Sequence, residues 1–195
     1  MTLLALLRHG TTPWNIEGRT QGRADIGLSA AGIAELRALS VPARLSGAAW
    51  IASPLGRAQQ TAALLHGPAR PEPRLIETDW GAWEGLPVTA YRPFAAHMTG
   101  RGRGGLDLRP PGGESPRDVQ ARLRDLFAEL ATATAPVVGV THKGVIRAAL
   151  SLATGWDMAD KAPVKLAWRA LHLFDIAADG GLSLREANVA LESRS

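Results

Sequence analysis

Short apolar runs alternate with amphipathic stretches along this chain of 195 residues. Three runs are apolar and bounded by turn or polar residues, which is typical of buried strands; they are residues 3–7, 48–52 and 137–140. Four stretches are expected to be helices, the first with Ser29 as its N-cap; they cover residues 29–36, 55–66, 115–133 and 144–154. Two further strands are predicted around a turn at 179–181, at residues 170–176 and 182–187. The alternation indicates an α/β fold.

Polar side chains that could take part in catalysis or bind a ligand follow each of the three apolar runs. Arg8 and His9 follow the first run, and Gly10 comes next, where a glycine would let backbone amides approach an anion. Arg57 lies in the first turn of the helix after the second run, and His142 follows the third. Open α/β sheets bind ligands at the carboxyl ends of their strands. We therefore expect these cations and imidazoles to converge on one crevice that can handle a phosphate.

Glu77, in the segment 75–85, adds a carboxylate to this set. Each residue also has an ordinary structural explanation. Arg57 could be a surface helix residue, His142 a capping residue and Glu77 part of a solvated turn. These explanations weaken when taken together, because unrelated surface residues would not recur at strand ends.

The motifs, in their order along the chain, resemble the histidine phosphatase superfamily, the phosphoglycerate mutase-like group. The resemblance implies a three-layer α/β/α sandwich around a mainly parallel central sheet, with residues 1–195 forming a single domain. The glycine-rich, proline-rich and arginine-rich residues at about 86–113 are expected to be a lid-like insertion over the site. The similar positions are Arg8, His9, Gly10, Thr12, Trp14, Asn15, Gln21, Gly22, Leu28, Ser29, Gly32, residues 53–62, Glu77, Gly81, Trp83, Glu84, Gly85, residues 111–115, Thr141 and His142.

The resemblance also implies a mechanism of double displacement at phosphorus. His9 would attack the phosphoryl group and become a phosphohistidine, while its other ring nitrogen donates to a backbone carbonyl. Glu77 would protonate the leaving oxygen and then deprotonate the attacking water. Either burial or contact with the leaving group must then oppose the effect of the nearby cations on its pKa. Glu84 would brace the loop through backbone hydrogen bonds. The expected phosphate-binding side chains are those of Arg8, Arg57, His142, Asn15, Gln21 and Thr12.

Two positions depart from common patterns of the family, and their effects stay open. Thr11 stands where many relatives carry Glu, and Lys143 where many carry Gly. Lys143 either brings extra positive charge near the phosphate or points to solvent. Three histidines match no motif, and His172, which alternates with apolar neighbours, is expected to be structural; the other two are His66 and His97.

The first expectation for function is a metal-independent phosphomonoesterase, a phosphoric monoester hydrolase that acts on a small phosphorylated metabolite. One alternative is a phosphoglycerate mutase-type isomerase that uses the same phosphohistidine, and a remote one is an inert phosphate-binding scaffold. A mutase needs a closing lid with dedicated cations, whereas the stretch before residue 111 is short and its cations are scattered. These cations are Arg92, Arg101, Arg103 and Arg109.

Composition further narrows the classes of protein to which this chain could belong. The chain has no cysteine and therefore no disulfide framework, and no metal-ligand spacing or cofactor motif is present. No signal peptide or membrane span is evident, so we expect a cytoplasmic protein with no membrane partner. The net charge of +4 is modest, and no basic run interleaved with aromatics argues for nucleic acid. The oligomeric state stays open, with a homodimer as one option.

Overall fold

A six-stranded sheet forms the centre of the protein in a computed structural model, which describes residues 1–91 and 105–194. The strand order is β4-β3-β5-β1-β6-β7. The first four strands in this order run parallel, β6 is antiparallel to β1, and β7 is antiparallel to β6. The sheet is therefore mainly parallel, as predicted. Its strands are β1 (Thr2–Arg8), β3 (Ala49–Ala52), β4 (Arg70–Pro71), β5 (Val137–Thr141), β6 (Ala170–Ile176) and β7 (Leu182–Ala190).

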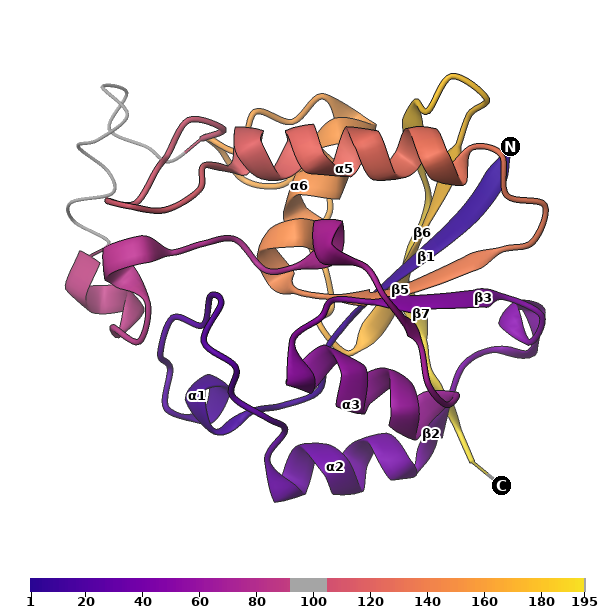
Figure 1. The fold of residues 1–195 in the computed structure, drawn as a ribbon, viewed down its shortest axis with the longest axis horizontal. Coiled ribbons are helices and arrows are strands. Elements are labelled where there is room, and N and C mark those ends of the chain that lie inside the picture. Colours follow the sequence, from indigo (N-terminus) through magenta and orange to yellow (C-terminus); the bar gives the residue numbers. More distant parts are fainter. Residues whose placement is uncertain (92–104, 195) are drawn as a thin grey trace.

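Helices cover both faces of this sheet and make the three layers (Figure 1). On one face lie α2 (Ala30–Arg37) and α3 (Gly56–Leu65), and on the other lie α5 (Pro116–Leu130) and α6 (Lys143–Thr154). The predicted helices and strands are all present, with ends that differ by up to three residues. Ser29 caps α2 through a side-chain bond to the amide of Gly32, as expected.

The alternation of side chains along β1 explains why two separate cores form. Leu4 and Leu6 belong to the core under α5 and α6, whereas Ala5 and Leu7 belong to the core under α2 and α3. All four side chains are buried because successive residues of a strand point to opposite faces of the sheet. A continuous apolar run is thus what a strand between two helical layers requires.

The structure adds short elements that the apolar pattern does not reveal. α1 (Pro13–Ile16) is a single turn with a capping box between Thr12 and Asn15. β2 (Leu39–Ser40) and β8 (Glu192–Ser193) form a small second sheet. An element of four or fewer residues is too short to show a helical or strand period in its hydrophobic pattern. Only capping residues could therefore predict such an element from the sequence. The structure also contains three 3₁₀ turns, η1 (Ala43–Leu45), η2 (Pro73–Leu75) and η3 (Gly81–Trp83).

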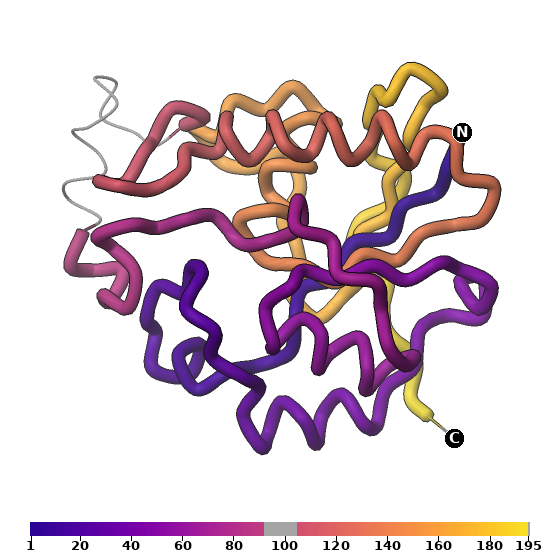
Figure 2. Tube along the Cα trace, viewed as in Figure 1, coloured from indigo at the N-terminus to yellow at the C-terminus, as the bar shows by residue number. Residues whose placement is uncertain are grey.

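Loops gather at the edge where the parallel strands end, at the left in Figure 2. They include the indigo segment around α1 and the magenta segment that leads to residue 91. Of the expected lid at about 86–113, residues 92–104 lie outside the described residues, and with them Arg92, His97, Arg101 and Arg103. The carboxyl ends of β1, β3 and β5 are therefore surrounded by loops that can form a site.

Candidate active site

The register of three neighbouring strands places the first candidate residues side by side. Arg8 pairs with Thr141 between β1 and β5, so His9 and His142 each follow the last paired residue of their strand. The amide of His9 donates to the carbonyl of Thr141 at 2.9 Å. Ser53 follows β3 at the same level, and its amide donates to the carbonyl of Val140 at 2.9 Å. The strand pairing alone therefore brings His9, Ser53 and His142 to one point.

His9 is buried and arranged as a neutral nucleophile. Its Nδ1 lies 2.7 Å from the carbonyl oxygen of Gly10, the backbone bond that the sequence predicts. Because a carbonyl can only accept, Nδ1 carries the proton and the lone pair remains on Nε2. Burial, together with the positive charges of Arg8 and Arg57, holds the pKa of His9 well below its usual value. The imidazole is thus uncharged and its Nε2 can attack.

His142 is completely buried, and its ring centroid lies 5.1 Å from that of His9. Its Nε2 lies 2.7 Å from Oγ of Ser53, which also accepts from the amide of Leu55 at 3.3 Å. The hydroxyl can then donate to Nε2, which puts the imidazole proton on Nδ1. Burial and the neighbouring positive charges lower the pKa of His142 well below its usual value. Nδ1 has no partner among the described residues and can donate to a phosphate oxygen.

Arg57 is fully buried at the start of α3 and is held by backbone carbonyls. Its guanidinium donates to the carbonyl oxygens of Gly22 at 2.6 Å and Ala24 at 2.8 Å. Burial lowers its pKa, although the pKa of an arginine stays far above neutral pH and the charge remains. The Nε atoms of Arg57 and Arg8 are buried and make no hydrogen bond within the described part of the chain. Both cations therefore have a donor left for an anion.

Glu84 fixes the loop whose carbonyls hold Arg57. Its carboxylate accepts from the amides of Arg23, at 3.1 Å, and Ala24. A Cβ added to Gly22 would lie 2.8 Å from Oε2 of Glu84, so the close approach requires a glycine. The expectation that Glu84 braces a loop through backbone bonds is confirmed.

Glu77 is buried and accepts two backbone amides, from Thr78 at 2.8 Å and Gly144 at 3.3 Å. Burial raises the pKa of its carboxyl, against the opposing effects of these amides and of Arg57. Burial is thus the factor that favours the protonated form of this acid in a cationic site. A Cβ on Gly144 would lie 2.5 Å from Oε1 of Glu77, so this glycine gives the carboxyl its room.

The interpretation of Gly10 as a glycine that admits an anion is wrong. Its amide donates to Oγ1 of Thr61 at 2.9 Å. A Cβ at this position would lie 2.6 Å from Cδ1 of Leu36 and 3.3 Å from Cδ2 of Leu28. Gly10 is therefore needed because α2 packs closely on the end of β1.

Thr12, Asn15 and Gln21 form one hydrogen-bonded group beside His9. Oε1 of Gln21 accepts from Oγ1 of Thr12 at 2.8 Å and from Nδ2 of Asn15 at 3.3 Å. Thr12 also caps α1. Nε2 of Gln21 is buried and has no partner within residues 1–91 and 105–194. Gln21 thus offers a neutral donor, and Thr12 and Asn15 hold it in place.

A cavity of about 790 Å³ is lined by Arg8, His9 and Glu77, and by the aromatic residues Trp80 and Tyr91. Arg57 and His142 are not among its lining residues. Lys143 also lines the cavity, but its side chain is exposed to solvent, so both interpretations of this position stay open. The remaining lining residues are Asn15, Gly18, Arg19, Thr20, Gln21, Thr78, Val88, Gly105, Leu108, Glu114, Pro116, Gly144, Arg147 and Met158.

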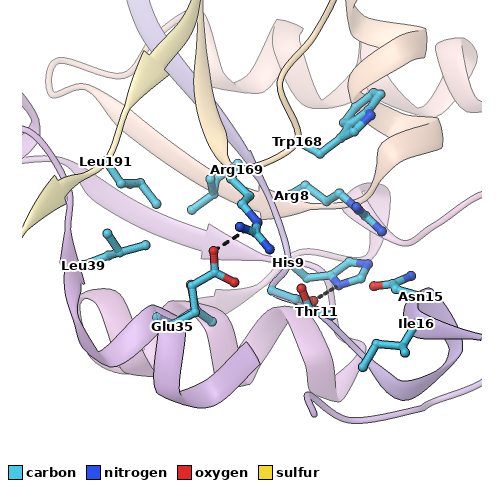
Figure 3. A pocket seen from close by; sticks show the side chains of 13 residues that line it. Arg8, His9, Thr11, Asn15, Ile16, Glu35, Leu39, Trp168, Arg169 and Leu191 are labelled. Atoms are coloured by element: carbon cyan, nitrogen blue, oxygen red, sulfur yellow. Dashed lines mark hydrogen bonds and ion pairs between the residues drawn. The ribbon is translucent and has the colours of Figure 1, made fainter. Parts of the chain in front are cut away.

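A smaller hollow of about 260 Å³ lies on another side of His9 and Arg8 (Figure 3). Thr11 lines it, as do the apolar side chains of Leu36, Leu39 and Leu191. Arg169 reaches across to Glu35, with 3.0 Å between Nε and Oε1. The hollow is mainly apolar apart from this pair and the end of β1.

Two residues near the site were not predicted to act there. Ser53 orients His142, and Arg122 of α5 donates to the carbonyl of Arg74 and, at 3.4 Å, to Glu114. Arg122 could have been found, because the helical period places it on the apolar face of α5. By contrast, Arg109 is outside the cavity and pairs with Asp118 at 2.6 Å.

His172 and His66, the two unmatched histidines within the described residues, behave as structural residues. His172 is buried on β6, its Nδ1 accepts from the amide of Asn188 at 3.3 Å, and burial lowers its pKa to about 4. His66 stacks on Trp50 with 4.7 Å between ring centroids. Within the described residues, no group of three or more acidic, histidine or cysteine side chains could hold a metal ion. The described helices include none long and apolar enough to cross a membrane.

The sequence model of the histidine phosphatase superfamily (branch 1) matches residues 4–189. This chain belongs to the histidine phosphatase superfamily. The sequence resemblance and the fold that it implies are thereby confirmed. Members of the superfamily are phosphatases and mutases, so the cluster around His9 is placed in an enzymatic family.

Several superfamily members are similar along much of the chain. A bifunctional protein of Mycobacterium tuberculosis is 33% identical over 195 residues, which cover 96% of this chain and 54% of that protein. This chain therefore spans about half the length of that relative. The glucosyl-3-phosphoglycerate phosphatase of M. tuberculosis is 36% identical over 165 residues, 77% of this chain and 74% of the relative.

A solved structure of mycobacterial glucosyl-3-phosphoglycerate phosphatase superposes with a TM-score of 0.78 at 28% identity, covering 97% of this chain and 100% of that one. A 2,3-bisphosphoglycerate-dependent phosphoglycerate mutase of Methylobacterium radiotolerans is 36% identical over 132 residues, 62% of each chain. Phosphatases and mutases are thus both among the relatives.

Proposed function

We propose that this protein is a metal-independent phosphomonoesterase that hydrolyses a small phosphorylated metabolite through a phosphohistidine on His9. The bond from Nδ1 of His9 to the carbonyl of Gly10 is the observation that carries this proposal. It leaves the lone pair of a neutral imidazole on Nε2, which is the form that attacks phosphorus. The similarity to a phosphatase supports hydrolysis of a phosphoric monoester as the class of reaction.

In the first step, Nε2 of His9 forms a bond to phosphorus while the bond from phosphorus to the leaving oxygen breaks. Glu77, protonated because it is buried, gives its proton to that oxygen. Arg8 and Arg57 balance the charge of the phosphoryl oxygens, and Nδ1 of His142 donates to one of them. The alcohol then leaves, and Glu77 is ionised.

In the second step, water attacks the phosphorus of the phosphohistidine and gives a proton to the carboxylate of Glu77. The bond between phosphorus and Nε2 breaks, so His9 regains its lone pair and inorganic phosphate is released. The amides of Thr78 and Gly144 stabilise the ionised carboxylate between the two steps. Both residues thus return to their starting states after one turnover.

The second candidate is a mutase, favoured by the relationship to a 2,3-bisphosphoglycerate-dependent phosphoglycerate mutase. A mutase must keep water from the phosphohistidine and hold its intermediate during reorientation. Of the cations before residue 111, Arg109 is bound to Asp118 outside the cavity, which removes it from the residues that could grip such an intermediate.

Phosphate release separates the two reactions. The purified protein should liberate inorganic phosphate from 3-phosphoglycerate and other small phosphomonoesters. It should convert 3-phosphoglycerate to 2-phosphoglycerate poorly, even with 2,3-bisphosphoglycerate present. Efficient, bisphosphate-stimulated interconversion with little phosphate release would replace the hydrolase with the mutase.

A further inference from the structure

Two cations on α6 line the same cavity as His9 and Glu77. Lys143 and Arg147 are four residues apart, so their side chains lie on the same face of the helix. Neither has a role in the reaction proposed above.

An aromatic ring positions each of these cations. Nζ of Lys143 lies 5.1 Å from the ring centroid of Trp168, and Cζ of Arg147 lies 4.8 Å from that of Trp156. Such contacts attract a cation to the face of the ring without supplying a negative charge. The two side chains are therefore held in place while their charges stay available.

No carboxylate among residues 1–91 and 105–194 forms an ion pair with Lys143 or Arg147. The sequence of residues 92–104 contains no Asp or Glu that could supply one. Two other charged residues along the cavity are compensated. Arg19 pairs with Glu17 at 2.7 Å, and Glu114 pairs with Arg23 at 3.0 Å.

Charge balance shows that the two cations exceed what one phosphoryl group needs. Arg8 and Arg57 already offset the two negative charges of a phosphomonoester dianion, and Glu77 is neutral when it acts as the acid. Burial and the like charges of Arg8 and Arg147 lower the pKa of Lys143, so a second anion would relieve this repulsion.

We propose that Lys143 and Arg147 bind a second anionic group, a carboxylate or a further phosphate, on the leaving alcohol of the substrate. This assignment rests on the proposed function, since it describes the part of the substrate that departs. The preferred substrate class is then a small phosphomonoester with two separated anionic groups. Lys143 and Arg147 determine specificity by distinguishing such substrates from those with a neutral leaving group.

Binding to a His9→Ala variant tests the assignment without turnover. Two matched pairs of probes are titrated by calorimetry: 3-phosphoglycerate against glycerol 3-phosphate, and fructose 1,6-bisphosphate against fructose 6-phosphate. In at least one pair, we expect the probe with the second anionic group to bind about tenfold or more tightly than its partner without that group. The pair that shows the preference identifies the second group as carboxylate or phosphate.

Adding Lys143→Met or Arg147→Met should remove most of that preference, which is read as the ratio of the two dissociation constants. Lys165→Met and Arg124→Met are matched controls on exposed residues that do not line the cavity, and they should keep the ratio. Equal affinities within both pairs, or a ratio that survives both cavity substitutions, would overturn the proposal.

Phosphate release by the unmodified protein distinguishes this result from the proposed function. A preference that depends on Lys143, without any phosphate release, would keep the second anion site and reject the hydrolase. Release from both members of each pair at equal kcat/KM would keep the hydrolase and reject the second anion site.

Discussion

Glu84 and Arg57 both bind the backbone of the segment 22–24, Glu84 at its amides and Arg57 at its carbonyls. A carboxylate that is not among the lining residues of the cavity therefore helps to set the position of Arg57. Two nearby glutamates thus have separate tasks, because Glu77 lines the cavity and Glu84 acts through a loop.

The first prediction distinguishes the tasks of the two glutamates by how the loss of kcat in each variant depends on the leaving group of the substrate. Glu77→Gln should lower kcat about a hundredfold or more on alkyl phosphates, because the amide has no proton to give to a poor leaving group. The loss should be much smaller on p-nitrophenyl phosphate, whose leaving group needs little protonation. Steady-state kinetics on both substrates measure the difference.

Glu84→Gln is the matched comparison. It keeps the shape of the side chain but weakens the bonds to the amides of Arg23 and Ala24, and through that loop it loosens Arg57. Both substrates should then be slowed by a similar factor. If Glu84→Gln instead showed the leaving-group pattern and Glu77→Gln did not, the assignment of the acid would be wrong.

A phosphorylated enzyme is the second prediction. Protein quenched during turnover of a ³²P-labelled substrate should carry an acid-labile, base-stable phosphate. The label should vanish in His9→Ala and persist in Ser53→Ala, which alters the orientation of His142 without removing the nucleophile. Recovery of the phosphate on His142 would reverse the roles of the two histidines.

The third prediction concerns the cations. Arg57→Met should lower kcat about a hundredfold or more, by analogy with the loss of one fixed donor to a developing oxyanion. Arg124→Met, on an exposed position of α5, serves as the control and should leave kcat unchanged. A folded Arg57→Met protein with the same kcat as Arg124→Met would contradict a role of Arg57 in stabilising the transition state.

Sequence reasoning recovered the parts of the site that follow from strand ends. The apolar runs located β1, β3 and β5, and their ends gave His9, Arg57 and His142. The same reasoning failed at Gly10, whose contact with Leu36 depends on how α2 packs. A residue pattern identifies which element a side chain belongs to, but the packing of a distant helix decides what that side chain meets.

The role of Ser53 shows the same limit. It was visible as part of a motif, yet its bond to His142 joins residues that are 89 positions apart. Only the pairing of β3 with β5 brings them together. Likewise, the raised pKa of Glu77 has burial as its main cause, and the sequence left open whether burial or contact with the leaving group would raise it.

Chelation provides the fourth prediction. The proposed phosphate shell consists of arginine and histidine side chains, which stabilise the transferring group without a divalent ion. Activity should therefore survive dialysis against EDTA and should not rise when Mg²⁺, Mn²⁺ or Zn²⁺ is added back. A strict dependence on an added ion would contradict the proposed mechanism.

The last prediction is the pH dependence of kcat/KM. The reaction needs His9 neutral and Glu77 protonated. The pKa of His9 lies well below 6.5, so activity should persist as the pH falls through the ordinary histidine range and should be lost only at more acidic pH. The pKa of Glu77 is raised above 4.5, so activity should fall when the pH rises through that raised value and the acid ionises.

Glu77→Gln identifies which group causes the alkaline decline. The amide does not titrate, so the part of the decline that belongs to Glu77 should disappear, while any part that comes from ionisation of the substrate phosphate should remain. The acidic limb should stay in place because His9 is intact in this variant. Profiles of kcat/KM from pH 4 to 9, measured on one phosphomonoester with both proteins, make the comparison. An alkaline decline that is identical in the two proteins would exclude Glu77 as the proton donor.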